Sequence, residues 1–217
     1  MSHTPIVYFV EGNIGTGKST FLKMIEKCYP DDCQVIYEPL DTWTSFKDKE
    51  GVNILGHFYK DPKRYAYTFQ NIAFISKIEK LTEIDYSKRF IFIERSIWSD
   101  KNVFAKNCHL SGLMNDIEYQ VYHTWFNWIE KNAKIPVHFT FMYLKCSPDT
   151  SYKRVNIRRR AEESGLSLEY LTEIHDRHEE WLTPASLAWV VDAEVDYTDE
   201  TTFRRLMDPR VLVIFNK

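Results

Sequence analysis

Residues 12–19 carry the sharpest chemical signal in the sequence. They read Gly-Asn-Ile-Gly-Thr-Gly-Lys-Ser, a complete match to the pattern G-x-x-x-x-G-K-[ST]. Glycines let backbone N–H groups turn toward phosphate oxygens, and a helix beginning near Lys18 adds its positive dipole end. The lysine can contact the β- and γ-phosphates of ATP, and the Ser19 hydroxyl can ligate Mg²⁺. The pattern predicts a phosphate-binding loop (P-loop) made of Gly12, Asn13, Ile14, Gly15, Thr16, Gly17, Lys18, Ser19 and Thr20.

Charged residues also follow two apolar runs farther along the chain. Glu38-Pro39 ends one run, and Glu94-Arg95-Ser96 ends the other. In an open parallel sheet, ligands bind beyond the carboxyl ends of the strands. A carboxylate there can take the proton of an attacking hydroxyl, and an arginine can orient it and share the phosphoryl charge. Beside a P-loop, these residues predict a kinase in which Glu38, Arg95 and Lys18 are catalytic.

Four other classes of nucleotide-binding protein fit the sequence less well. A GTPase needs a guanine-reading N-K-x-D segment, which the chain lacks. In a motor ATPase the apolar run usually ends in Asp or Asp-Glu, whereas here it ends in Glu94-Arg95-Ser96. A nucleoside monophosphate kinase, the nearest alternative, needs a basic residue where this chain has Glu38-Pro39. A non-enzymatic nucleotide-binding module could lose Lys18, Glu38 or Arg95, and all three are present.

The elements that must position these residues alternate along the chain. Such alternation predicts one α/β domain over residues 1–217, with a five-stranded parallel sheet and helices on both faces. We expect strands at residues 6–10, 34–37, 90–93 and 137–144, and helices at 18–28, 62–86, 116–131, 148–160 and 168–182. The fifth strand is either 188–191, which we favour, or 211–215.

Composition narrows the class of protein further. The length of 217 residues and the 44% hydrophobic content suit one domain with a sizeable core. A net charge of -3 argues against a nucleic-acid polymer as a binding partner. No apolar run reaches the roughly 20 residues that span a bilayer. Four cysteines without a CxxC pair predict free thiols in a reducing compartment. We therefore expect a cytoplasmic protein without a membrane partner; organelle import and viral origin stay open.

Together the motifs resemble the deoxynucleoside kinase family, most closely its deoxycytidine and deoxyguanosine kinase branch. The resemblance implies a P-loop kinase fold with an arginine-rich lid at about residues 154–166. It also implies Mg²⁺-dependent transfer of the γ-phosphate of ATP to the 5′-hydroxyl of a deoxynucleoside, and a homodimer. The matching stretches are residues 11–20, 38–39, 67–70, 94–100 and 154–163, with 104–107 and 178–182 closest to that branch.

The resemblance also implies a role for each matching residue. Glu38 would be the general base on the 5′-hydroxyl with Arg95 beside it, and Glu94 would lie toward Mg²⁺ with Ser19. Gln70 would read the base, which suits a carboxamide because it offers one donor and one acceptor. The sugar 3′-hydroxyl would meet Tyr59 and Glu163. The apolar pocket walls would be Trp43, Leu55, Phe58 and Phe104, and the lid arginines Arg154, Arg158 and Arg160.

Helical spacing supports part of this assignment independently. Gln70, Ala73, Phe74 and Lys77 share one helical stripe, which we interpret as a ligand wall; a solvated edge is the alternative. Lys77 stands where the branch carries an arginine, and we expect it to pair with Asp100. In the family such a pair accompanies deoxycytidine and purine deoxynucleosides, so we predict these substrates over thymidine.

Overall fold

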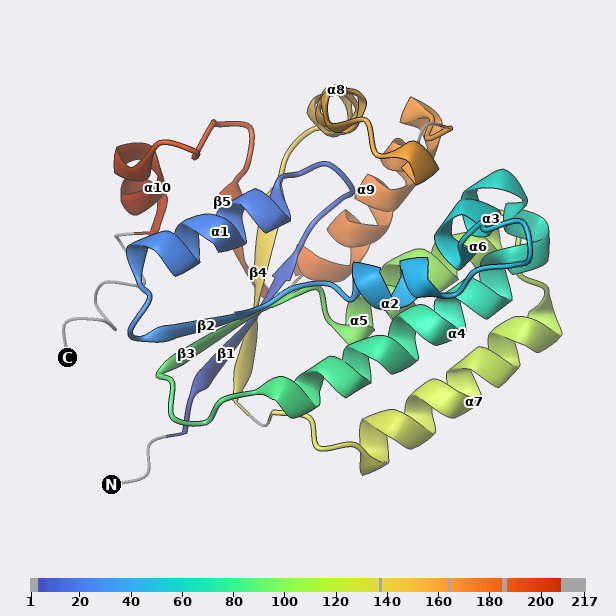
Figure 1. Ribbon diagram of the computed structural model, residues 1–217, viewed down its shortest axis with the longest axis horizontal. Coiled ribbons are helices and arrows are strands. Elements are labelled where there is room, and N and C mark those ends of the chain that lie inside the picture. The colour runs from blue at the N-terminus through green and yellow to red at the C-terminus, as the bar shows by residue number, and fades with distance from the viewer. Residues whose placement is uncertain (1–3, 137, 164, 185–186, 208–217) are drawn as a thin grey trace.

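A computed structural model describes residues 4–136, 138–163, 165–184 and 187–207. Its centre is a sheet of five parallel strands in the order β2-β3-β1-β4-β5 (Figure 1). The sheet confirms the expected α/β class. The strands are β1 (Ile6–Glu11), β2 (Cys33–Ile36), β3 (Phe90–Glu94), β4 (Phe139–Lys145) and β5 (Ala188–Asp192).

Helices cover both faces of the sheet, as the alternation predicted. Alternate strand residues point to opposite faces, so Tyr8 and Val10 pack against α1 while Val7 and Phe9 face the other layer. The helices are α1 (Lys18–Cys28), α2 (Leu40–Ser45), α3 (Ile54–Lys60), α4 (Pro62–Lys80), α5 (Ile97–Ser99), α6 (Lys106–Leu110), α7 (Asp116–Asn132), α8 (Pro148–Arg158), α9 (Leu168–Leu182) and α10 (Glu200–Met207).

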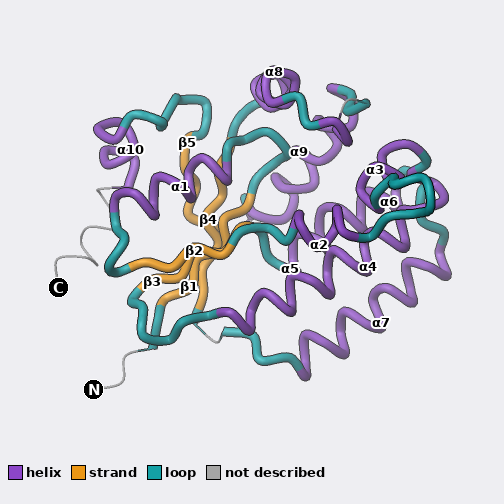
Figure 2. The backbone as a smooth tube through the Cα atoms, in the orientation of Figure 1, coloured by secondary structure: helices purple, strands orange, loops and turns teal. Residues whose placement is uncertain are grey.

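A second apolar core lies outside the sheet, among helices. Phe74 of α4 packs on Tyr122 and Phe126 of α7, with ring centroids 5.9 and 5.4 Å away. The two long helices run side by side (Figure 2). Within the described residues, no helix is long and apolar enough to cross a membrane.

Several element boundaries differ from the prediction. The helix expected to reach residue 86 ends at Lys80, because Leu81 and Ile84 turn into the core beside the sheet. The helix expected to reach residue 160 ends at Arg158, where Arg159 adopts a left-handed φ of 52°. Strand β2 begins one residue earlier than expected, and strand β4 begins two residues later than expected.

The fifth strand is the favoured segment. β5 pairs with β4 from Phe141 opposite Ala188 to Lys145 opposite Asp192. The alternative at residues 211–215 lies outside the described residues, as does residue 137. Helix α10 was not expected; its buried side chains, Phe203 and Met207, join the core around α1.

Candidate active site

The P-loop connects β1 to α1, as the motif required. Lys18 is buried in the loop, and its Nζ donates to the carbonyl oxygens of Gly12 (3.1 Å) and Asn13 (2.7 Å). Gly15 has φ +84°, and a Cβ there would lie 2.5 Å from the Ser151 carbonyl oxygen. Only glycine fits that approach of the loop to α8.

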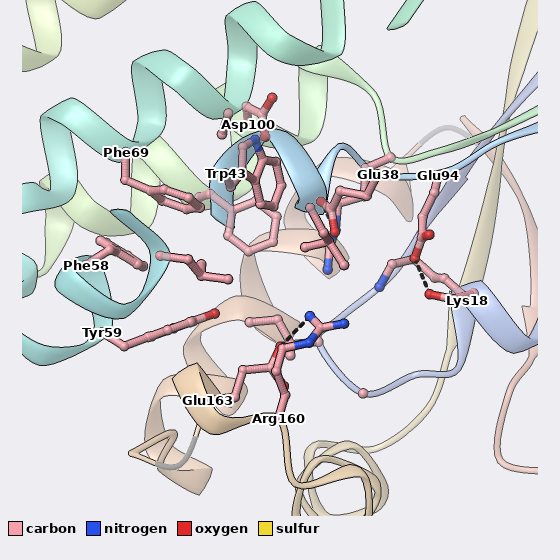
Figure 3. A pocket seen from close by; sticks show the side chains of 18 of the residues that line it. Lys18, Glu38, Trp43, Phe58, Tyr59, Phe69, Glu94, Asp100, Arg160 and Glu163 are labelled. Atoms are coloured by element: carbon pink, nitrogen blue, oxygen red, sulfur yellow. Dashed lines mark hydrogen bonds and ion pairs between the residues drawn. The ribbon is translucent and has the colours of Figure 1, made fainter. Parts of the chain in front are cut away.

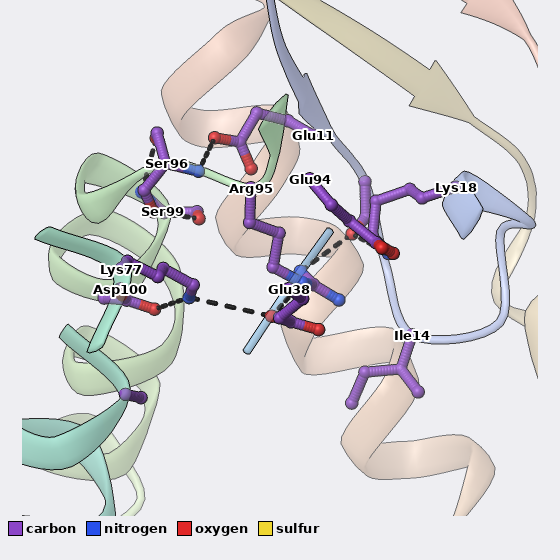
Figure 4. A network of polar contacts seen from close by, with 12 residues as sticks. Glu11, Ile14, Lys18, Glu38, Lys77, Glu94, Arg95, Ser96, Ser99 and Asp100 are labelled. Carbon is purple, nitrogen blue, oxygen red and sulfur yellow. Dashed lines mark hydrogen bonds and ion pairs between the residues drawn. The ribbon is translucent and has the colours of Figure 1, made fainter. Parts of the chain in front are cut away.

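Arg95 has an unusual backbone conformation directly after β3. Its φ is 62°, which is rare for a residue with a side chain and often accompanies function. The end of β1 holds this turn through three hydrogen bonds. Arg95 N donates to the Val10 carbonyl (3.0 Å), Arg95 Nη1 to the Gly12 carbonyl (3.0 Å), and Ser96 N to Glu11 Oε1 (2.8 Å). The P-loop and the arginine are therefore fixed relative to each other (Figure 4).

Glu38 lies beside this arginine at the end of β2. Its Oε1 is 3.1 Å from Arg95 Nε and 3.6 Å from Lys77 Nζ. Burial raises the pKa of Glu38, but the charges of Arg95, Lys77 and Lys18 outweigh burial and hold the pKa below its usual value. The carboxylate is thus ionised at neutral pH and can accept a proton.

The pKa of the P-loop lysine is also lowered, but for a lysine this favours the neutral form. Burial, and then the nearby charge of Arg95, lower the pKa of Lys18 to about 7. An approaching polyanion would favour its charged form. Lys18 is therefore suited to respond to a phosphate group.

Ser19 and Glu94 contact each other beside Lys18. The Ser19 Oγ donates to Glu94 Oε1 over 2.8 Å. The described residues hold no cluster of three or more His, Cys, Asp and Glu side chains that could bind a metal. Mg²⁺ commonly takes only one or two protein oxygens and completes its shell with phosphates and water. This donor pair fits that mode of binding.

A cavity opens in front of Glu38 and Arg95 (Figure 3). It contains about 700 Å³ of space, a figure that includes its open mouth. Every residue predicted to contact the substrate lines it: Glu38, Trp43, Leu55, Phe58, Tyr59, Gln70, Lys77, Arg95, Asp100, Phe104 and Glu163.

Ala73, which the predicted stripe placed on a ligand wall, also lines this cavity. Three further lining residues were not predicted: Leu40, Phe69 and Tyr170. Phe69 precedes Gln70, so it had a local signal. Tyr170 lies on α9 far along the chain, and no motif marked it.

Gln70 can recognise a ligand because its carboxamide is almost unpaired. The side chain is 1% exposed, and its Nε2 has only Cys108 Sγ, 4.0 Å away. Within the described residues its Oε1 has no hydrogen-bond partner. The alternative of a solvated edge is wrong. The placement of Phe74 on the same wall is also wrong, because this ring packs on α7 instead.

Lys77 forms the expected pair with Asp100, at 2.5 Å between Nζ and Oδ1. Both side chains are buried, and Asp100 begins a π-helical turn (Asp100–Ala105) that also carries Phe104. Burial raises the pKa of Asp100 to about 6 although Lys77 opposes the shift. The carboxylate remains charged at neutral pH and titrates just below it.

The arginine-rich segment follows α8. Arg158 and Arg160 both form ion pairs with Glu163, the latter at 2.9 Å. Arg154 points elsewhere: its Nη1 donates to the carbonyl oxygens of Thr16 (3.2 Å) and Ala193 (2.7 Å). The three arginines thus divide into two that face the Glu38 cavity and one that contacts the P-loop backbone.

A second cavity adjoins the first across the P-loop. The two cavities share Gly15, Lys18, Ser19, Glu94, Arg158 and Arg160. The far wall of the second cavity was not predicted in detail and consists of Lys23, Ile157, Val195, Asp196, Tyr197 and Thr198. A phosphate donor in one cavity and a hydroxyl acceptor in the other would meet at Lys18 and Arg95.

Comparison with known proteins shows which family this chain resembles. The profile of the deoxynucleoside kinase family matches residues 8–213. A fowlpox virus protein named as a probable deoxycytidine kinase is 38% identical over 175 residues, covering 80% of this chain and 70% of its own. Human deoxycytidine kinase is 34% identical over 197 residues, covering 82% and 75%. Human mitochondrial thymidine kinase 2 is 37% identical over 181 residues, covering 83% and 66%.

Proposed function

The chain belongs to the deoxynucleoside kinase family, has its P-loop kinase fold and is an ATP-dependent kinase of deoxynucleosides; we propose that Glu38 is its general base. The contact between Glu38 Oε1 and Arg95 Nε, 3.1 Å long, carries this proposal. It lies in the first cavity, which adjoins the second at Lys18, Ser19 and Glu94. An ionised carboxylate there can accept the 5′-hydroxyl proton as the oxygen attacks the γ-phosphorus.

Arg95 fixes the direction of this carboxylate. The guanidinium bonds Glu38 on one side and the Gly12 carbonyl on the other, so it cannot swing away. Its charge also lies beside the transferring phosphoryl group, where negative charge develops. The unusual backbone of Arg95 sets this position.

The donor phosphates would lie over the P-loop backbone, from Gly12 to Thr20, beside Lys18. Ser19 and Glu94 would hold Mg²⁺, which neutralises phosphate charge when it is bound. Arg158 and Arg160 would close a lid over the phosphates, because a guanidinium pairs bidentately with phosphate oxygens. Arg154 would support the loop from the donor side.

The deoxynucleoside would occupy the first cavity. Gln70 would bond the base through its unpaired carboxamide, and Tyr59 and Glu163 would bond the 3′-hydroxyl. Glu163 already joins two lid arginines, so sugar recognition and lid position would be linked. The apolar contacts come from Trp43, Leu55, Phe58 and Phe104.

For the base, we propose deoxyguanosine, deoxyadenosine or deoxycytidine over thymidine. The relatives include kinases named for deoxycytidine and for thymidine, so we argue the preferred base from the residues that line the cavity. A charged Lys77–Asp100 pair can bond an amino-bearing base. Placing it against the 5-methyl group of thymine would desolvate charge without compensation.

We also propose a homodimer built on α7. Ile117, Val121, Trp125 and Trp128 follow helical spacing on one exposed face, and Trp125 and Trp128 are 54% and 60% exposed. Ile75 adds an exposed apolar group on neighbouring α4. An apolar patch of this kind suits a second copy related by a twofold axis.

The free thiols support a reducing compartment, and we propose the cytoplasm. Cys28, Cys33, Cys108 and Cys146 form no disulfide, and three of them are buried. Detection of a disulfide in protein isolated from its native source would contradict this location.

A panel of acceptors tests the proposed function. Purified protein, ATP and Mg²⁺ are incubated with each of the four deoxynucleosides and, separately, each of the four deoxynucleoside monophosphates. We expect monophosphate products from the deoxynucleosides and no diphosphates. Phosphorylation of the monophosphates alone would favour the monophosphate kinase that the sequence left as its nearest alternative.

A further inference from the structure

The segment between β5 and α10 crosses over to the P-loop. Its Tyr197 is 3% exposed, and the phenol oxygen donates to the Thr16 carbonyl over 2.9 Å. The ring packs edge-on against Phe21 of α1, with centroids 5.6 Å apart. Phe203 of α10 packs on the same ring of Phe21, at 5.2 Å. The hydroxyl is thus held in place by the aromatic core behind it.

The Thr16 carbonyl accepts a second hydrogen bond from another part of the chain. Arg154 Nη1 donates to it over 3.2 Å and also bonds the Ala193 carbonyl at the start of the same segment. Burial raises the pKa of the Tyr197 phenol, so this group keeps its proton and remains a donor. Two donors from distant elements therefore fix one carbonyl of the P-loop.

The consequence follows from the geometry of the peptide bond. The described residues contain no cis peptide, so the Thr16–Gly17 peptide is trans and its C=O and N–H point in opposite directions. With the Thr16 oxygen turned toward Tyr197, the Gly17 N–H must point to the other side of the loop. Backbone N–H groups of a P-loop bind phosphate on that inner side.

Gly17 itself shows how closely the tyrosine approaches. Its φ is +93°, and a Cβ there would lie 2.6 Å from the Tyr197 hydroxyl. A side chain at residue 17 would displace the tyrosine and release the carbonyl. The position of the Tyr197 hydroxyl therefore requires glycine at residue 17.

We infer that Tyr197 is a positioning residue for the phosphate donor: its hydroxyl, with Arg154, orients the Thr16–Gly17 peptide so that the Gly17 N–H is preset for a phosphate of ATP. This inference rests on the proposed placement of ATP over the P-loop. Because the contact lies away from the Glu38 cavity, the hydroxyl acts on the donor and not on the deoxynucleoside.

Tyr197→Phe removes the hydroxyl and keeps the ring on Phe21. The loss of one hydrogen bond should raise the KM and the calorimetric Kd for ATP about threefold to tenfold. We expect kcat at saturating ATP to stay within about twofold and the KM of the deoxynucleoside to stay unchanged, since the ordered loop matters mainly for donor binding. Tyr143→Phe is the matched control. It removes a phenol bonded to Glu179 (2.8 Å) that lines neither cavity, and it should leave the ATP parameters unchanged.

Two outcomes would overturn the inference. One is an unchanged KM and Kd for ATP. The other is an equal rise in KM for both substrates, with a larger fall in Tm than Tyr143→Phe causes, which would indicate a general structural role. An inactive wild-type enzyme would reject the proposed function; an active wild type with an unaffected Tyr197→Phe variant would reject this inference alone.

Discussion

The Nζ atom of Lys77 lies 2.5 Å from Oδ1 of Asp100, in a buried pair that lines the first cavity. The same ammonium is 3.6 Å from Glu38 Oε1, so one cation lies between Asp100 and the proposed general base. The pair adds buried charge to the cavity that Gln70 also lines.

Removal of the pair should change base choice. In the double variant Lys77→Met with Asp100→Ala, a methyl-bearing base no longer meets buried charge, so kcat/KM for thymidine should rise relative to the other deoxynucleosides. The measurement is kcat/KM for all four substrates in both proteins. A wild type that already prefers thymidine, or an unchanged ranking in the variant, would show that this pair does not select the base.

Base choice should also depend on pH. Asp100 has a pKa raised to about 6, so it is ionised above pH 6 and takes up a proton below it. Discrimination against thymidine should therefore weaken as pH falls through 6. The lowered pKa of Glu38 keeps the proposed general base ionised over the same range. The ratio of kcat/KM for deoxycytidine and thymidine between pH 5 and 8 tests this. The double variant, which lacks the carboxylate, should give a flat ratio.

Lys18 should link ATP binding to proton uptake. Its pKa of about 7 means that the ammonium is largely deprotonated at pH 8, and the phosphate charge should raise that pKa on binding. Binding of Mg-ATP at pH 8 should therefore take up close to one proton, and uptake should vanish well below pH 7. Calorimetry in buffers of different ionisation enthalpy measures it.

The control is Lys18→Ala, which should show no uptake at pH 8 and lose most activity. Its Tm without ATP should not fall, because burial already disfavours the charged lysine. Retained activity with a large loss of Tm would identify Lys18 as structural.

The exposed face of α7 should determine assembly. Trp125→Glu with Trp128→Glu places two charges in the proposed interface and should yield a monomer at micromolar concentration. Tyr86→Glu, at a 60% exposed tyrosine that is not part of α7, should leave the assembly unchanged. Sedimentation velocity distinguishes the two species. A wild type that sediments as a monomer would remove the dimer proposal.

The sequence predicted the parts of the site that depend on local patterns. The P-loop and the carboxylates at Glu38 and Glu94 follow strands, and a parallel sheet brings strand ends together. Gln70 was assigned through the family resemblance and supported by helical spacing. The same spacing misplaced Phe74, because a helical stripe does not show where the cavity wall ends and the core begins. Apolar runs alone could not choose the last strand; its pairing with β4 does.

Contacts between distant segments could not be predicted. Tyr197 bonds Thr16 across 181 positions, and nothing in the local sequence of either residue indicates the other. Arg154 was expected at a phosphate because it belongs to an arginine-rich run. Its direction depends on the segment after β5, whose path the sequence left open.

The most direct test of the account is the turnover of Glu38→Gln. The amide keeps the shape of the side chain but cannot accept the 5′-hydroxyl proton, so kcat should fall about 10²- to 10⁴-fold. The Kd for the deoxynucleoside and the Tm should change little, because the proposed substrate contacts are mostly those of Gln70, Tyr59 and the apolar walls. Turnover within a few-fold of wild type would contradict the central claim that Glu38 is the general base.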